Sequence, residues 1–216
     1  MSELRFTLLS DGSSDRALIP ILRWTLIENS VQCSIQPSWA DLRHLRKPPK
    51  GLADRIAAAL EYWPCDLLFI HRDAEGDELQ RRRQEIDNAV QEVSSQVRNL
   101  PRAVFVVPVR MLEAWFLTDL DAIRHAAGNP GGSQQLEIPD VHSIEGLPDP
   151  KNLLYELLRD ASGLSGRRRR KMQVSHAVHR IGQVKSEFRA LRELAAFRLM
   201  EEDLRQVIGE CGWDGP

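Results

Sequence analysis

Short apolar runs alternate with longer amphipathic stretches through the first 127 residues of the chain. The continuous apolar runs at 66–71 and 103–109 are typical of strands that are covered on both faces of a sheet. Residues 4–10 predict another short strand, and residues 31–39 predict one from a weaker alternation of polar and apolar positions. We therefore expect four strands.

Helical spacing of apolar positions separates these strands. Helices are expected at 16–29, 51–63, 79–97 and 111–127. Pro20 predicts a kink in the first helix unless that helix begins later than the pattern indicates. Strands separated by helices imply a parallel sheet with right-handed crossovers. The predicted fold is α/β: a Rossmann-like, mostly parallel four-stranded sheet flanked by helices.

The pattern changes after residue 127. Residues 126–151 hold four Gly and four Pro without a sustained period, which predicts a long loop. The stretches 153–162, 176–197 and 199–210 beyond it have helical spacing without intervening strands. We expect an α/β domain at 1–127, a loop or linker at 128–150, and a helical portion at 151–216 that packs on the first domain.

Composition is that of an ordinary globular chain of 216 residues, with 42% hydrophobic and 28% charged positions. Three cysteines, Cys33, Cys65 and Cys211, lie far apart, so neither a disulfide framework nor a thiolate zinc site is indicated. The apolar run at the N-terminus is too short for a signal peptide, and no stretch approaches the roughly 20 apolar residues of a membrane span. We expect a cytoplasmic protein without membrane contacts.

Charge is unevenly distributed between the two parts of the chain. Residues 1–150 carry 16 Lys and Arg against 22 Asp and Glu, whereas residues 151–216 carry 13 against 9. An acidic body that concentrates divalent cations, joined to a basic tail, suits a polyanion, although such asymmetry is also common in proteins that bind none.

The strongest cationic feature of the sequence is a basic run at residues 167–171. It is either a solvated loop or a sequence-independent contact to nucleic-acid phosphates. Trp39, which precedes the segment DLRHLRK, is the tryptophan we consider for stacking on a base. The basic run consists of Arg167, Arg168, Arg169, Arg170 and Lys171.

Acidic residues follow three of the predicted strands. Because the carboxyl ends of parallel strands lie at one edge of a sheet, we expect these side chains to converge. Clustered carboxylates repel one another unless a cation or protons compensate them, and oxygen-rich ligand sets favour Mg²⁺ or Mn²⁺ over zinc. The residues concerned are Asp11 and Asp15 after the first strand, His71, Asp73, Glu75 and Asp77 after the middle strand, and Arg110 and Glu113 after the last.

Three motifs at these positions resemble the Toprim domain of topoisomerases, primases and overcoming-lysogenisation-type nucleases. DGSSD (11–15) resembles the E-G-x-x-D signature, with Asp11 in the place of the glutamate. HRDAEG (71–76) fits D-x-D-x-x-G, with His71 at the first Asp position, Asp73 at the second and Gly76 at the glycine. VRMLEAWFLTD (109–119) is similar to a segment of the DUF4276 Toprim-like bacterial family, some members of which neighbour ATPases in phage-defence gene clusters.

The resemblance implies a Toprim-like fold and a metal-dependent phosphodiester reaction on nucleic acid, with Mg²⁺ or Mn²⁺ as cofactor. It assigns catalytic roles to Asp11, Asp73 and Glu113, with Asp11 as the proton-transfer group or a metal ligand and Asp73 as the principal ligand. His71 and Glu75 join them as metal ligands. Supporting positions are Asp15, Gly12, Gly76 and Arg110.

Two departures from the Toprim pattern leave alternatives open. Asp11 is one methylene shorter than Glu, and His71 is a nitrogen ligand for Mn²⁺, a proton shuttle, or a sign that one metal site has decayed. The second hypothesis is therefore a catalytically degenerate binding or regulatory subunit that partners an AAA or ABC-type ATPase. Glu113 and Arg110 could form a purely structural ion pair, Asp11 and Asp15 could be turn and cap residues, and a homodimer remains open.

Overall fold

Four parallel strands form one sheet in the computed structural model, which describes residues 3–75, 78–184 and 187–215. The order across the sheet is β2-β1-β3-β4, so the α/β fold expected from the sequence is confirmed. Leu9 lies opposite Ala40 and Ile70, and His71 lies opposite Val106. All four carboxyl ends therefore reach the same edge. The strands are β1 (Glu3–Leu9), β2 (Ser34–Ala40), β3 (Leu67–His71) and β4 (Arg102–Val106).

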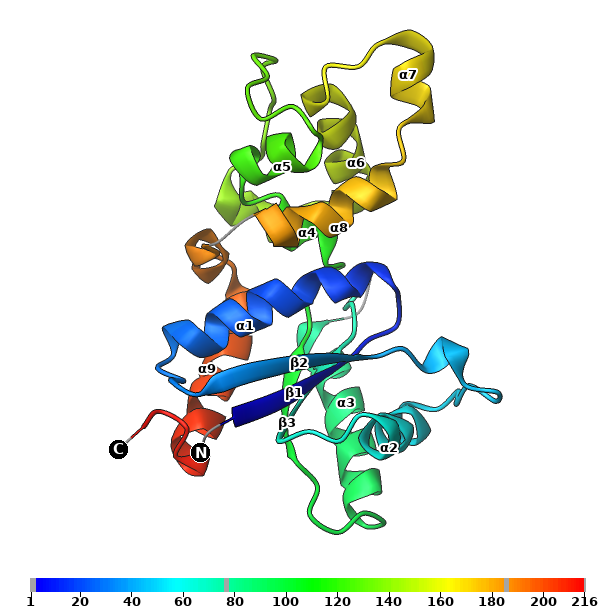
Figure 1. The fold of residues 1–216 in the computed structure, drawn as a ribbon, viewed down its shortest axis with the longest axis vertical. Helices are drawn as coiled ribbons and strands as arrows, with labels where there is room; N and C mark the ends of the chain where they lie inside the picture. The colour runs from blue at the N-terminus through cyan, green and yellow to red at the C-terminus, as the bar shows by residue number, and fades with distance from the viewer. Residues whose placement is uncertain (1–2, 76–77, 185–186, 216) are drawn as a thin grey trace.

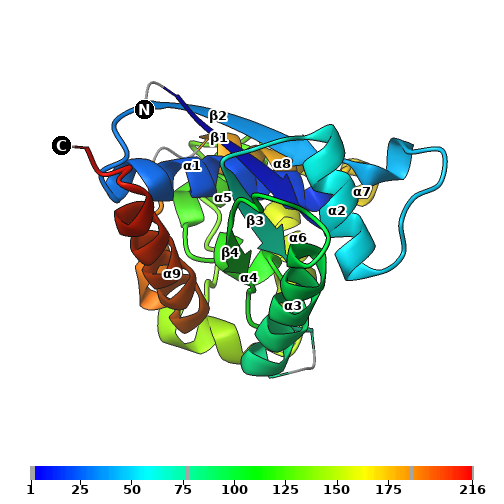
Figure 2. The same cartoon turned by 90° about the horizontal axis from the view of Figure 1, so that it is seen from below.

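Helices cover both faces of the sheet (Figure 2). Helices α1 (Leu18–Glu28) and α9 (Ala195–Cys211) lie on one face, and α2 (Leu52–Tyr62) and α3 (Leu79–Ser94) lie on the other. Successive strand residues point to opposite faces, so Phe69 packs with α1 and α9 while Ile70 packs with α2 and α3. This alternation explains why β3 is buried along its whole length.

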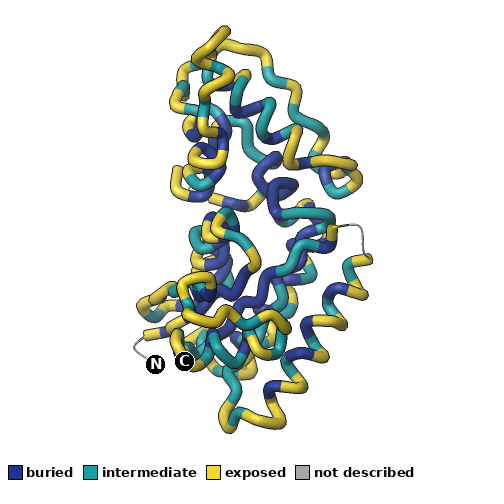
Figure 3. Tube along the Cα trace, turned by 90° about the vertical axis from the view of Figure 1, so that its right-hand side faces the viewer, coloured by how far each residue is buried: buried dark blue, intermediate teal, exposed yellow. Residues whose placement is uncertain are grey.

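The remaining helices form a second group beyond the carboxyl edge of the sheet (Figure 1). Their apolar side chains belong to the same hydrophobic cluster as the α1 face of the sheet, and the buried stretches continue from one group to the other (Figure 3). The helices are α4 (Glu113–Phe116), α5 (Leu120–Ala126), α6 (Pro150–Ala161), α7 (Gly166–Lys171) and α8 (Val174–Val184). Short 3₁₀ helices occur at Ser14–Ala17, Leu42–His44, Val141–Gly146 and Arg189–Glu193.

Two predicted helices differ from the structure near the carboxyl edge. Helix α1 begins at Leu18, after a 3₁₀ turn, so Pro20 lies in the first turn, where its missing N–H has no intrahelical partner to lose. The helix predicted at 111–127 is divided into α4 and α5, because the Asp119 carboxylate accepts the N–H of Ala122 at 2.9 Å and caps a new helix.

The C-terminal helices also differ from their prediction. The pattern predicts a single helix across 176–197, but α8 ends at Val184 and α9 begins at Ala195. The Glu145 carboxylate accepts the N–H groups of Ala195 and Ala196, both at 2.9 Å, and so caps α9 from a distant segment. The basic run is a short helix, α7, rather than a loop.

Gly182 lets α8 approach the turn that follows β1. A Cβ atom at this position would lie 2.6 Å from the carbonyl oxygen of Ala17. Only glycine allows this separation, so α8 supports the 3₁₀ turn Ser14–Ala17 directly. Within the described ranges, no helix combines the length and apolar character that crossing a membrane requires.

Candidate functional site

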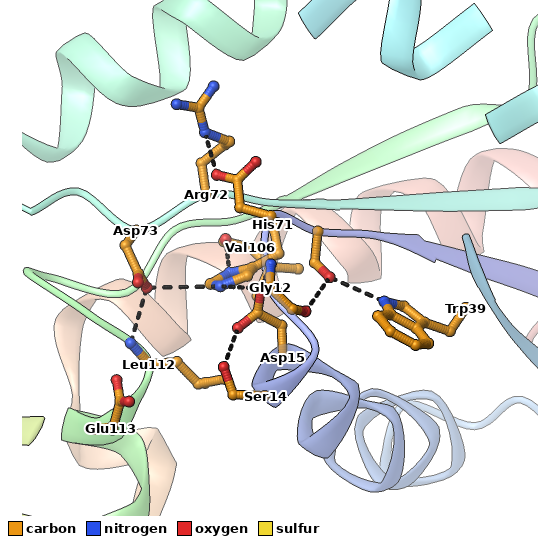
Figure 4. Close-up of polar contacts among 12 residues, drawn as sticks. Gly12, Ser14, Asp15, Trp39, His71, Arg72, Asp73, Val106, Leu112 and Glu113 are labelled. Atoms are coloured by element: carbon orange, nitrogen blue, oxygen red, sulfur yellow. Dashed lines mark hydrogen bonds and ion pairs between the residues drawn. The ribbon is translucent and has the colours of Figure 1, made fainter. Parts of the chain in front are cut away.

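Three loops bring polar side chains together at the carboxyl edge of the sheet (Figure 4). Asp15 comes from the turn after β1, His71 and Asp73 from the end of β3, and Glu113 from the start of α4. The Nε2 atom of His71 lies 3.9 Å from Asp15 Oδ2 and 3.6 Å from Asp73 Oδ1. The structure thus brings together four of the residues that the sequence suggests from three separate segments.

His71 is held in one orientation by the sheet itself. Its side chain is 2% exposed, and its Nδ1 atom lies 3.0 Å from the carbonyl oxygen of Val106 on β4. A carbonyl oxygen only accepts hydrogen bonds, so Nδ1 carries a proton in this contact. The Nε2 atom is therefore the one that faces Asp15 and Asp73, and it is free to accept a proton or to bind a cation.

Asp15 is both a turn residue and a member of this group. Its Oδ2 atom accepts the N–H of Gly12 at 2.7 Å, and its Oδ1 atom accepts the hydroxyl of Ser14 at 3.2 Å. The residue is buried. These bonds orient the carboxylate so that Oδ2 lies 3.9 Å from His71 Nε2, which shows the turn role of Asp15 and places its side chain beside His71.

Asp73 has a perturbed carboxyl group. Its pKa is raised to about 6, chiefly by burial; the negative charges of Asp15 and Glu113 act in the same direction, while His71 and the N–H of Leu112 oppose the rise. The Leu112 N–H donates to Asp73 Oδ1 at 2.8 Å. Asp73 is thus a carboxylate that gains stability from a proton or a cation at neutral pH.

Glu113 is buried and lies close to Lys151. The Nζ atom of Lys151 is 3.4 Å from Glu113 Oε1, and the charge of Glu113 raises the pKa of Lys151. The ion-pair partner in the structure is Lys151, whereas the sequence suggests Arg110. Lys151 was missed as a site residue, although the helix-start signal Asp149-Pro150 places it in the first turn of α6.

Glu75 and Arg110 connect the loops after β3 and β4 through their backbones. Both have left-handed conformations, with φ of 55° and 63°, and the N–H of Glu75 donates to the carbonyl oxygen of Arg110 at 2.6 Å. Non-glycine residues in this region carry strain that is common at functional sites. The Glu75 side chain is exposed. The expected positions Gly76 and Asp77 lie outside the described residues.

Asp11 is engaged by two arginines. Its Oδ1 atom pairs with Arg55 of α2, and its Oδ2 atom lies 2.8 Å from Nε of Arg72. Arg55 also donates to the carbonyl oxygen of Ser10 at 2.7 Å. Of the two acids in the DGSSD segment, Asp15 therefore joins His71 and Asp73, while Asp11 closes an ion-pair group with residues of α2 and the β3 loop.

The donor atoms suit a hard divalent cation by their chemistry. Carboxylate oxygens are the ligands that Mg²⁺ and Mn²⁺ prefer, and Mg²⁺ commonly uses one or two protein carboxylates together with substrate phosphates. Among residues 3–75, 78–184 and 187–215, no group of three or more His, Cys, Asp or Glu is arranged to hold a metal ion by itself. A cation bound at these residues would have to complete its coordination with substrate or water oxygens.

The basic helix α7 lies away from the sheet, at the far side of the helical group (Figure 1). It has no buried residue. Arg169 pairs with Glu156 and Asp160 of α6, both at 2.8 Å, whereas the other four cations of the run are exposed. The structure therefore presents these four side chains to solvent.

Comparison with known proteins found no matching family model, no matching curated protein and no matching solved structure. The observations so far establish an α/β fold with a parallel four-stranded sheet and a helical C-terminal part.

Proposed function

We propose that the chain is a divalent-metal-dependent phosphoryl-transfer protein that cleaves phosphodiester bonds in nucleic acid. The observation that carries this proposal is that Asp15 and Asp73 face His71 at the carboxyl edge of the sheet, with Glu113 near enough for its charge to raise the pKa of Asp73. Carboxylates that lie near one another are stabilised by a cation that is shared with a polyanionic substrate. The resemblance of the DGSSD and HRDAEG segments to Toprim motifs supports the same chemistry.

Asp73 and Glu113 are the residues that would hold the Mg²⁺ or Mn²⁺ ion. A bound ion of this kind lowers the pKa of water and neutralises charge that develops on phosphate. Asp73 has a raised pKa, so a nearby positive charge would stabilise its ionised form, and Glu113 has the half-exposed Lys151 beside it. Lys151 is placed to contact a phosphate oxygen at the rim.

His71 is the proton carrier in this proposal. With Nδ1–H bonded to Val106, His71 would accept at Nε2 a proton from the attacking water, and Asp15 and Asp73 would stabilise the imidazolium so formed. The resemblance gave the proton-transfer role to Asp11. The geometry favours His71 for it, because both oxygens of Asp11 are engaged by arginines.

One observation favours a second candidate function. Arg55 and Arg72 neutralise the acid that occupies the position of the Toprim glutamate. A site in which this acid is engaged by arginines suits a binding or regulatory subunit that acts with an ATPase partner, as in a phage-defence system. Under this candidate, nucleic acid binds and no bond is cleaved.

Cleavage assays separate the two functions. Supercoiled DNA, single-stranded DNA and RNA are incubated with the purified chain in Mg²⁺, Mn²⁺ or chelator. The first function predicts chelator-sensitive cleavage that falls by at least about a hundredfold in Asp73→Asn and His71→Gln. Asp11→Asn is the matched control and retains cleavage. Binding that persists without cleavage, and without dependence on Asp73, supports the second function instead.

A further inference from the structure

A cavity opens beside the turn between β1 and α1. Its volume is about 750 Å³, within the range of about 300–1,000 Å³ typical of ligand pockets. The ring of Trp39 lies on one side of the turn, and Asp73 and Glu113 lie on the other (Figure 4). The lining side chains come from this turn, the start of α1, β2 and α8, and they include Ser13, Arg16, Pro20, Trp39, His179 and Gln183.

Trp39 is a partly exposed ring with a fixed orientation. Its Nε1–H donates to the hydroxyl oxygen of Ser10 at 3.0 Å, and the Ser10 hydroxyl donates to the carbonyl oxygen of Gly12 at 3.4 Å. The guanidinium of Arg43 lies over the ring, 5.3 Å from its centroid. An indole that is held in place by such contacts is a platform on which a flat aromatic group can stack.

Cationic and polar groups surround this platform. Arg16 is exposed on the same turn, and no ion pair to it is found in the part of the chain that the structure describes. Its guanidinium offers paired N–H donors of the kind that bind phosphate. His179 adds a second nitrogen donor, while Ser13 and Gln183 can hydrogen-bond to the edge of a base.

Trp39 also lines a second, smaller cavity, of about 200 Å³. Arg43, Lys50 and Arg55 line this cavity together with Asp41 and Asp11, which pair with Arg43 and Arg55. Lys50 therefore adds a cation beside Trp39 in addition to Arg16, which suits the repeated phosphates of a chain better than a single nucleotide.

We propose that the cavity beside Trp39 takes one nucleotide of a single-stranded nucleic acid, with the base stacked on Trp39 and its phosphate against Arg16 and His179. A base must leave its own stack to enter such a cavity, which is why the proposal specifies a single strand. The inference rests on the proposed function, because it supplies a substrate-binding position next to the carboxylates.

Binding is measured by fluorescence anisotropy with a labelled single-stranded oligonucleotide in the presence of chelator. Trp39→Ala and Arg16→Ala should each weaken binding by about tenfold or more, and Trp39→Phe, which keeps a stacking ring and the packing, should lose less. Tyr62→Ala removes an exposed aromatic ring from α2, and Arg23→Ala removes an exposed cation from α1, so both are matched controls that should bind as the wild type does.

Competitors identify the ligand. Unlabelled single strand should displace the probe, whereas duplex of the same sequence and free nucleoside monophosphate should displace it poorly. Wild-type affinity in both Trp39→Ala and Arg16→Ala overturns the proposal, and equal competition by the free nucleotide overturns its polymeric part. Binding is measured in chelator and cleavage in Mg²⁺ or Mn²⁺, so the two results are separate. A Trp39-dependent affinity with no cleavage in either metal refutes the nuclease function alone, and cleavage without this dependence refutes the binding cavity alone.

Discussion

Asp73 and Leu112 join the loops that follow β3 and β4, because the backbone N–H of Leu112 donates to Asp73 Oδ1 at 2.8 Å. The carboxylate is thereby fixed close to Glu113, the next residue in the chain after Leu112, and to the Nε2 atom of His71 at 3.6 Å. A backbone bond thus holds a carboxyl group where its own ionisation is disfavoured. An asparagine at position 73 can keep this bond through its amide oxygen, which makes Asp73→Asn a mild replacement in structural terms.

The raised pKa of Asp73 predicts a pH-dependent cost to stability. The folded protein holds this proton more tightly than the unfolded chain, so the free energy of unfolding should fall as pH rises from about 4 to about 6, through the interval between the ordinary pKa and the raised one. Asp73→Asn removes the cost. Because the side chain is partly exposed, we expect a stabilisation on the order of 1–2 kcal/mol near neutral pH and little near pH 4.

Denaturant unfolding of wild type and Asp73→Asn at both pH values checks this expectation. The gain in stability should grow with pH. An Asp73→Asn protein that is less stable than the wild type at neutral pH would contradict this expectation. It would show that neighbouring groups already compensate the negative charge of Asp73 in the metal-free protein.

The two acids of the first loop should differ in their effect on cleavage. Asp15→Asn removes an acceptor from the Gly12 and Ser14 bonds and a charge from the His71 environment, so it should cost about 1 kcal/mol of stability and lower cleavage by at least about tenfold. Asp11→Asn should keep cleavage within about threefold, because Asp11 pairs with arginines outside the group around His71. The loss of such an ion pair, with a half-exposed carboxylate, should lower stability by about 0–1 kcal/mol. Loss of cleavage in Asp11→Asn with normal cleavage in Asp15→Asn would reverse the assignment.

Close packing at Gly182 predicts a destabilising Gly→Ala change. A Cβ atom there meets the Ala17 carbonyl oxygen, so Gly182→Ala should cost about 1–3 kcal/mol, as α8 and the turn move apart. At Gly209, inside α9, an added Cβ atom would meet nothing within 4 Å, and Gly209→Ala should stabilise the protein by about 0.5–1 kcal/mol. Thermal unfolding of the two variants compares them directly, and a neutral Gly182→Ala would argue against the contact.

Glu201 ties the C-terminal helix to α1. It is 1% exposed, and its carboxylate binds Arg192, Arg205 and Asn29. Glu201→Gln should cost about 1–2 kcal/mol, because the partly buried donors of Arg192 and Asn29 lose a charged acceptor while the Arg205 pair is exposed. The neighbouring exposed Glu202 is the matched control, and Glu202→Gln should change stability by less than about 0.5 kcal/mol. Equal effects of the two substitutions in urea unfolding would contradict a structural role for the Glu201 ion pairs.

The sequence predicted the sheet and the layers well because each strand is an apolar run set between amphipathic stretches. The break between α4 and α5 was hidden, since apolar positions continue on both sides of Asp119 and its capping role depends on local geometry. The start of α9 was hidden for another reason: its cap, Glu145, lies 50 residues away in the chain.

The composition of the site was predictable only in part. The rule that strand ends meet placed Asp15, His71, Asp73 and Glu113 in one region. It could not decide which acid of the first loop faces the site, because the arginines that engage Asp11 come from α2 and the β3 loop. Lys151 was missed because α6 follows a long loop whose path no local pattern specifies.

The most direct test of the central claim is a Mn²⁺ titration followed by electron paramagnetic resonance at neutral pH, with wild type, Asp73→Asn and Asp11→Asn. The account predicts that the wild type and Asp11→Asn bind Mn²⁺ alike, and that Asp73→Asn binds at least about tenfold more weakly. Equal binding by the wild type and Asp73→Asn, or loss of binding only in Asp11→Asn, would contradict it.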